Sequence, residues 1–130
     1  MEGILAVNKL GAIGLKGGLP WSCKEDLKHF KRLTIGKHLI VGRKTAESLP
    51  KLKGRVLHIV TKDNPLEQIL KLDHSFIVIG GASIYSQLLD KCDIIHCSLI
   101  NDCTDGDTYF ELTPKQKEKT IYYEFNTEIC

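Results

Sequence analysis

Short, mostly hydrophobic runs recur along the chain, separated from one another by glycine or polar residues. Runs such as GILAV and HLIV are too short for helices, and they lack the alternation of a strand with one solvent-facing side. Continuous runs of this kind are typical of strands that are buried on both faces of a parallel sheet. The pattern predicts strands at residues 3–7, 38–41, 55–60, 76–79, 94–100 and 120–125.

Segments with helical periodicity lie between these strands. For the third of them, Asn64 is expected to be the N-cap and Pro65 the first helical residue. Alternation of strands and helices indicates an α/β fold with a central, mainly parallel sheet covered by helices on both faces. A chain of 130 residues fits one domain, 1–130. The helices are predicted at residues 23–34, 44–48, 65–72 and 82–89.

The helix predicted at residues 23–34 places an acidic residue on its hydrophobic face. Ser22 followed by Glu25 matches a capping box, which sets the helical phase. At about 100° per residue, Asp26 falls among the hydrophobic side chains and Glu25 falls opposite them. The inward arc holds Cys23, Asp26, Leu27, Phe30, Leu33 and Thr34, and the solvated face holds Lys24, Glu25, Lys28, His29, Lys31 and Arg32.

The helix dipole does not explain an inward-facing Asp26. An acid in the first turn of a helix gains about 0.3 to 1 kcal/mol from the dipole. Burying an unpaired carboxylate costs several kcal/mol, which is more than that gain. Either the helix face opens to solvent at Asp26, or the carboxylate meets a partner with a structural or a functional role.

Glycine and basic residues follow the carboxyl ends of several predicted strands. Residues 42–45 read GRKT, residues 80–83 read GGAS, and Thr61 and Lys62 follow the strand at 55–60. Such turns let backbone amides approach a phosphate, although each of them could also be an ordinary tight turn. Neither turn matches the usual dinucleotide or P-loop fingerprint. Together they favour a ligand with more than one phosphate.

Composition excludes several classes of function. A hydrophobic content of 42%, a charged content of 26% and a net charge of +2 are typical of a globular protein and give no sign of nucleic-acid binding. The first hydrophobic run is too short for a signal peptide or a membrane span, so a cytoplasmic protein is expected. The odd number of cysteines indicates reduced thiols. Apolar packing is favoured over a metal site for Cys92, His96, Cys97 and Cys103.

Several ordered motifs together resemble the dihydrofolate reductase family. LPWSCKEDLKHFKRLT resembles its signature, and the family's other landmarks follow as AVNKLGAIG, VGRKTAES, LKGR, VIGGASIY and DGDTYF. The resemblance runs from Ile4 to Phe110. It implies NADPH-dependent reduction of 7,8-dihydrofolate to tetrahydrofolate.

The resemblance also implies roles for residues on the substrate side. Asp26 matches the sole ionisable group of the family's pteridine pocket, Trp21 would hold an ordered water, and Leu19 would belong to a mobile loop. Arg55 would bind the α-carboxylate of the substrate's glutamate tail, because its planar guanidinium suits a carboxylate. The pocket walls would be Ala6, Leu27, Phe30 and Leu49, with Ser98 supporting the aspartate.

On the cofactor side, the resemblance implies that Arg43 and Lys62 contact the phosphate that distinguishes NADPH from NADH. Gly80 and Gly81 match a glycine pair that is joined by a cis peptide in the family. The implied cofactor-binding residues are Ile13, Gly14, Gly42, Arg43, Lys44, Thr45, Thr61, Lys62, Gly80, Gly81, Ala82 and Tyr85.

The chain also departs from the family pattern. Ala82 replaces a common third glycine, residues 63–75 leave room only for a helix, and one strand follows Phe110 where the family completes a hairpin. Trimmed edge strands are therefore expected, and a monomer is favoured over a dimer formed through an exposed edge. The alternatives are a riboflavin-pathway pyrimidine reductase of the same fold, a catalytically weak folate- or nucleotide-binding or structural module, and a generic phosphate-binding domain. Trp21, Asp26 and Arg55 favour folate.

Overall fold

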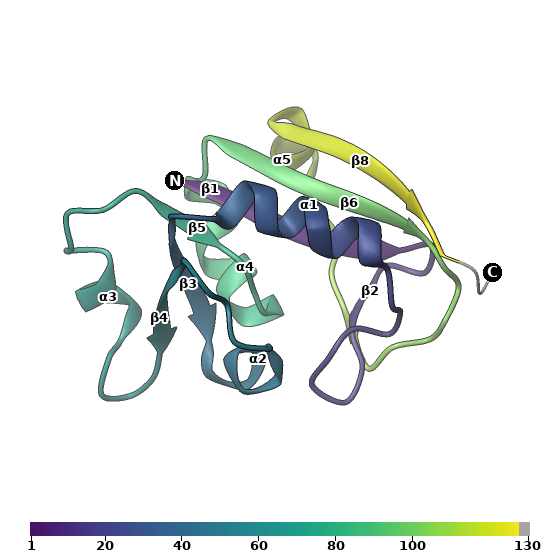
Figure 1. The fold of residues 1–130 in the computed structure, drawn as a ribbon. Coiled ribbons are helices and arrows are strands. Elements are labelled where there is room, and N and C mark those ends of the chain that lie inside the picture. The colour runs from purple at the N-terminus through teal and green to yellow at the C-terminus, as the bar shows by residue number, and fades with distance from the viewer. Residues whose placement is uncertain (128–130) are drawn as a thin grey trace.

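A six-stranded, entirely parallel sheet forms the centre of the molecule (Figure 1). The computed structural model describes residues 1–127. The strand order is β4-β3-β5-β1-β6-β8, so β1 lies in the interior of the sheet and β4 and β8 form its edges. The strands are β1 (Glu2–Asn8), β3 (His38–Gly42), β4 (Val56–Val60), β5 (Phe76–Val78), β6 (Ile94–Asn101) and β8 (Thr120–Asn126).

Helices cover both faces of this sheet, as predicted. In Figure 1, α1 crosses in front of β1 and β6, and α4 lies behind the sheet. A small antiparallel pair, β2 with β7, stands apart from the main sheet. The remaining elements are β2 (Ala12–Gly14), α1 (Lys24–Thr34), α2 (Arg43–Ser48), α3 (Leu66–Ile69), α4 (Ala82–Leu88), the 3-10 turn η1 (Leu89–Lys91), β7 (Thr108–Tyr109) and α5 (Pro114–Glu118).

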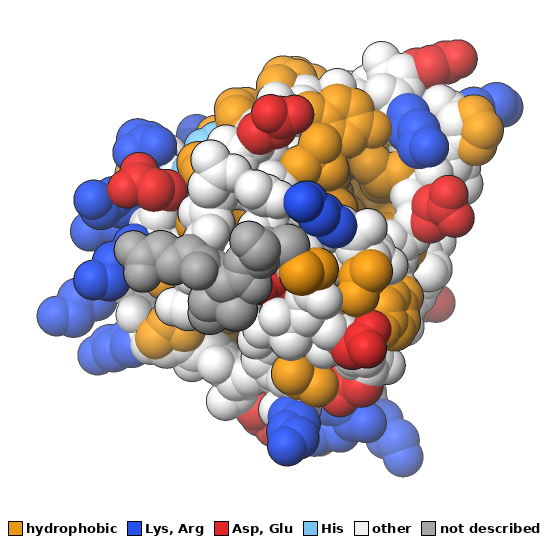
Figure 2. Space-filling view, turned by 90° about the vertical axis from the view of Figure 1, so that its right-hand side faces the viewer, with side chains coloured by type: hydrophobic (Ala, Val, Ile, Leu, Met, Phe, Trp, Pro, Cys, Tyr) orange, Lys and Arg blue, Asp and Glu red, His pale blue; other side chains and the backbone are white. Residues whose placement is uncertain are grey.

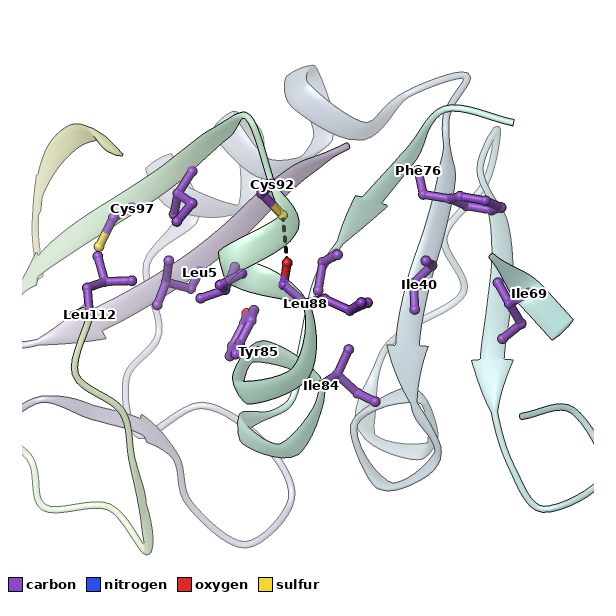
Figure 3. Packing of buried hydrophobic residues seen from close by; sticks show 13 residues of the cluster. Leu5, Ile40, Ile69, Phe76, Ile84, Tyr85, Leu88, Cys92, Cys97 and Leu112 are labelled. Carbon is purple, nitrogen blue, oxygen red and sulfur yellow. Dashed lines mark hydrogen bonds between the residues drawn. The ribbon is translucent and has the colours of Figure 1, made fainter. Parts of the chain in front are cut away.

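Alternating side chains of the strands divide the core between the two faces. In β3, Leu39 and Val41 pack in the cluster that includes Phe30 of α1, whereas Ile40 packs in the cluster that includes Leu88 of α4. Leu39, Ile40 and Val41 are each fully buried. Figure 3 shows the α4 side, where Tyr85 lies close to Leu5 and the Cys92 thiol donates to the carbonyl of Leu88 at 3.4 Å. Burial on both faces explains why these runs lack alternation.

The strand register builds a row of side chains beneath α1. Ala6 of β1 pairs with Ser98 of β6, and Ser98 pairs with Tyr123 of β8. Because side chains alternate along a strand, His96 and Ser98 share one face of β6, and Tyr123 and Phe125 share one face of β8. The register therefore brings residues that are far apart in the sequence under one helix.

All six predicted strands and four predicted helices overlap observed elements, but both predicted N-caps are wrong. The N-cap of α1 is Cys23 rather than Ser22, and no side chain caps that helix. The N-cap of α3 is Pro65 rather than Asn64, because the Asn64 side chain instead donates to the carbonyl of Ile59 at 3.2 Å. α3 is also shorter than the predicted 65–72. At Asn64, a hydrogen bond to the end of β4 replaces the predicted cap.

The part of the chain after Phe110 forms more than the single predicted strand. α5 begins at a true capping box made by Thr113 and Gln116, with proline at its first position. β8 then runs parallel to β6 at the edge of the sheet, where Ile121 is 46% exposed and Tyr122 is 45% exposed. Cys130 lies outside the described residues. Within residues 1–127, no helix is both long and hydrophobic enough to span a bilayer.

Candidate active site

A cleft of about 930 Å³ opens at the carboxyl ends of β3 and β5, beside the start of α1. Carboxyl ends of parallel strands are the usual place for a ligand site in an open α/β sheet. Most of the predicted site residues meet here. The lining includes Ala6, Ile13, Gly14, Leu19, Trp21, Asp26, Leu27, Phe30, Gly42, Arg43, Lys44, Thr45, Leu49, Gly80, Gly81, Ala82, Tyr85 and Ser98.

Asp26 is the buried acid of this cleft, with 7% of its surface exposed. Burial raises the pKa of its carboxyl, while a hydrogen bond with the Ser98 side chain and the nearby His29 lower it. Both explanations left open by the sequence therefore contribute: the helix face opens into a cleft, and the carboxylate has a hydroxyl partner. Ser98 lies opposite Ala6 in the β1–β6 register, and its side chain reaches Asp26 on α1.

His29 also lines the cleft, which contradicts its predicted position on the solvated face of α1. It is 7% exposed, and its ring lies 4.1 Å from the ring of Tyr123 and 5.4 Å from that of Phe125. β8 covers this side of α1, and no periodicity within the helix could reveal a strand that follows so much later. Burial lowers the pKa of His29, whereas the negative charge of Asp26 raises it.

Hydrophobic side chains form the walls near Asp26. Leu27 is 54% exposed because it faces the open cleft rather than the core, and Phe30 and Leu49 pack in the adjoining cluster. Trp21 is 6% exposed, and its Nε1 is a buried donor with no partner among the described residues. The pocket around the acid is therefore apolar, with few polar groups.

The two glycine turns meet at the other end of the cleft. The Gly42 amide donates to the carbonyl of Gly80 at 2.9 Å, and the Gly80–Gly81 peptide is cis, as the resemblance implied. A Cβ added to Gly81 would lie only 2.8 Å from Thr45 Oγ1. The turn is therefore packed so closely that a side chain at position 81 would displace Thr45. Glycine leaves this surface open to a ligand.

Three predicted residues do not line the cleft. Arg55 donates to the carbonyl of Lys53 at 3.1 Å and to Thr34 Oγ1 at 3.2 Å, although Leu49 and Leu52 on the preceding segment do reach the cleft. Thr61 Oγ1 accepts from the backbone amide of Asn64 at 3.0 Å, and the Lys62 side chain is exposed. The ligand contacts expected of Arg55, Thr61 and Lys62 stay predictions.

The loop around Leu19 is tied to β7 by residues that the sequence reasoning did not select. The Asp107 carboxylate accepts from the backbone amide of Lys16 at 2.8 Å, and this hydrogen bond lowers the pKa of Asp107. The backbone amide of Asp107 donates to the carbonyl of Gly14 at 2.9 Å. Asp107 and Thr108 lie in the motif DGDTYF, which is the signal in the sequence for this contact. The other lining residues that were not predicted are Ile4, Leu5, Ser48, Pro50, Leu52, Val60, Ile79, Ile84, Gln87 and Thr108.

Cys92 and Cys97 are buried, in the packing role that the sequence favoured, whereas Cys103 is exposed and His96 makes polar contacts with Glu2 and Tyr123. Burial raises the pKa of Cys92 to about 11 and that of Cys97 to about 12, which keeps both thiols protonated. In the described part of the chain, no three histidine, cysteine or acidic side chains are arranged to hold a metal ion.

Seen from the side of β2, basic and acidic side chains are both spread over the surface (Figure 2).

Comparisons with known proteins agree on one family. The family model described as dihydrofolate reductase matches residues 1–128. Dihydrofolate reductase type 15 of Escherichia coli is 33% identical over 95% of this chain and 89% of its own, and type 9 is 38% identical over 85% and 75%. A solved structure, dihydrofolate reductase from Enterococcus faecalis complexed with NADP(H) and RAB-propyl, matches with a TM-score of 0.77 at 30% identity. The match covers 87% of this chain and 77% of that chain.

Proposed function

The chain belongs to the dihydrofolate reductase family, and on that premise we propose how its cleft carries out the NADPH-dependent reduction of 7,8-dihydrofolate to tetrahydrofolate. The observation that carries the proposal is Asp26: a buried acid, one hydroxyl partner, and an apolar cleft in front of it. A pteridine presents adjacent amino and ring N–H donors, which suit a carboxylate.

Asp26 anchors the substrate and promotes its protonation. Its carboxylate accepts from the pteridine amino and ring N–H groups, which fixes the ring against Leu27 and Phe30. Its negative charge favours a proton on the pteridine ring nitrogen next to the carbon that is reduced. Burial strengthens this effect, because a charge acts more strongly where water is excluded. The Ser98 hydroxyl supports the carboxylate.

The glycine turns fit a cofactor with several phosphates. NADPH, when bound, supplies the hydride. Glycine at position 81 keeps the turn free of a side chain beside Thr45, and Arg43 and Lys44 add positive charge to the same end of the cleft. Arg43 pairs with Glu47 at 2.9 Å, and both side chains are more than half exposed, so the guanidinium can exchange this partner for a phosphate at little cost. Thr61 and Lys62 are proposed to contact the bound cofactor beside Arg43.

The remaining predicted residues align the substrate and exclude water. Leu19 and Trp21 border the cleft from the segment that precedes α1, Ala6 borders it from β1, and Tyr85 borders it from α4. Arg55 is proposed to bind the glutamate tail of the substrate. Its hydrogen bond to Thr34 connects it to the end of α1, the helix that carries Asp26.

Loss of NADPH absorbance on adding dihydrofolate tests the proposed reaction. Steady loss that requires both compounds is expected from the purified chain, and methotrexate should stop it. Absence of turnover together with tight methotrexate binding would instead indicate a folate-binding module. Turnover of the open-ribose pyrimidine of the riboflavin pathway, but not of dihydrofolate, would indicate the related reductase.

The protein is proposed to act on small molecules as a cytoplasmic monomer, without nucleic acid or membrane as partner. The exposed edge of β8 is the place where a dimer would form if the monomer proposal were wrong. Mass measurement by light scattering at working concentration distinguishes the two states.

A further inference from the structure

The mechanism above leaves His29 without a role, although it lies one helical turn from Asp26. Both residues are on α1, both line the cleft, and both are 7% exposed. The Nε2 atom of His29 is buried and has no hydrogen-bond partner in the part of the chain that is described. Buried ring nitrogens are normally paired, so this one calls for an explanation beyond packing.

We propose that His29 is a second ionisable group of the active site, a positioning residue whose charge controls the ionisation of Asp26. Its catalytic consequence rests on the proposed function, but the coupling itself does not. The resemblance to the reductase family implies a single ionisable group, Asp26, in the pteridine pocket, and a histidine coupled to that group adds a second one to the cleft.

Groups from three elements face His29. On α1, Asp26 favours its protonated form and Arg32 opposes it. From β6, His96 opposes it, and the His96 ring nitrogens contact Glu2 Oε1 at 2.8 Å and the Tyr123 hydroxyl at 3.0 Å. From β8, the rings of Tyr123 and Phe125 pack against it. Among the charged groups that act on His29 in the described structure, Asp26 is the only acid, so the ionisation of each of these two groups depends on that of the other.

Two further groups interact with Asp26 without competing in this range of pH. Burial raises the pKa of Cys97 to about 12, and it raises the pKa of the fully buried Tyr85 hydroxyl, which donates to the carbonyl of Ile4 at 2.7 Å. Both therefore remain neutral between pH 4 and 8. The charge on His29 is therefore the variable that Asp26 responds to.

Elementary electrostatics gives the size of the coupling. Side chains one turn apart on a helix are separated by roughly 6 Å. Two unit charges at that distance shift each other's pKa by about 0.5 units in bulk water and by about 2 units at the effective dielectric of a protein surface. Protonated His29 favours the anion, so removing it should move the ionisation of Asp26 to higher pH by about 0.5 to 2 units.

The first test replaces His29 and follows the carboxyl carbon of Asp26 by ¹³C NMR in the unliganded protein. His29→Phe keeps a ring against Tyr123 and Phe125, and His29→Gln serves if the phenylalanine variant does not fold. An upward shift of about 0.5 to 2 pH units is expected in either variant, and no shift overturns the proposal. The matched control is His74→Phe, because His74 is exposed and stacks on His38 rather than on the cleft. It should leave Asp26 unchanged.

The second test is the reciprocal one, because coupling between two sites is equal in both directions. In Asp26→Asn, the ring signals of His29 should titrate at lower pH by the same amount. An unchanged His29 titration contradicts the proposal even if His29→Phe is unstable. Both readouts are independent of turnover, so an inactive wild-type chain would overturn the proposed function without touching this inference. In an active chain, the pH profile of the hydride step should shift with Asp26.

Discussion

Replacing Asp26 with asparagine should stabilise the unliganded protein at neutral pH while it removes activity. Burial raises the pKa of this carboxyl above its usual 3.8, and the Ser98 hydroxyl and His29 offset only part of that rise. A group whose pKa is raised by folding stabilises the folded state below its unfolded value, and that contribution disappears as the pH rises through the folded-state pKa. At pH 7, the ionised acid therefore weakens the fold.

The size of the effect follows from linkage. Each unit by which the folded-state pKa exceeds 3.8 lowers the free energy of unfolding by about 1.4 kcal/mol at neutral pH. The free energy of unfolding of Asp26→Asn should exceed that of the wild type once the pH rises above 3.8. This difference should grow by at most about 1.4 kcal/mol per pH unit and become constant above the folded-state pKa of Asp26. The height of the plateau then measures the pKa shift directly.

Urea unfolding of both proteins across this range of pH is the assay. Glu25→Gln is the matched control, because Glu25 lies in the same helical turn but is exposed. It should show no such pH-dependent gain and should lose about 0.3 to 1 kcal/mol through the helix dipole. If Asp26→Asn is no more stable than the wild type at pH 7, then burial does not dominate the environment of Asp26, and the reasoning is refuted.

Three further predictions concern the turns, the tail-binding arginine and a histidine cluster. Gly81→Ala should lower NADPH affinity at least tenfold, because its Cβ would lie 2.8 Å from Thr45 Oγ1; unchanged affinity in a titration would contradict the tight turn. Arg55→Leu should weaken dihydrofolate binding far more than NADPH binding, and equal losses would point to misfolding. His58 contacts His38 at 2.9 Å, and burial, followed by His38 and His74, lowers its pKa. Neutral His58 should therefore contribute its full stability above about pH 6.5 and lose it as the pH falls from there, whereas His58→Phe should show a flatter urea-unfolding profile.

The features that were predicted correctly depend on the residues within a single helix or strand. The spacing of residues within α1 was enough to place Asp26 inward and Glu25 outward, and continuous apolar runs identified all six strands of the main sheet. The glycine turns at 42 and 80 were found because parallel strands end at one edge. These features depend on periodicity and topology, which are visible in a single chain.

The failures involve contacts between distant segments. His29 faces inward because Tyr123 and Phe125 cover it, and helix periodicity cannot anticipate a strand so far along the chain. β2 and β7 are too short to give a pattern of their own. The start of α5, by contrast, is a local feature that the sequence does contain, since Thr113, Pro114 and Gln116 form a standard helix-start motif. The one-domain organisation of residues 1–130 stays a prediction.

Single-turnover hydride transfer tests most directly the claim that Asp26 faces the substrate. Wild type and Asp26→Asn are loaded with NADPH, mixed with dihydrofolate, and followed through one turnover at pH 7 and at lower pH. The variant should bind NADPH normally and lose at least about a hundredfold in the hydride step at pH 7, the usual scale for a group that promotes proton transfer. Hydride transfer at close to the wild-type rate at both pH values would contradict the account.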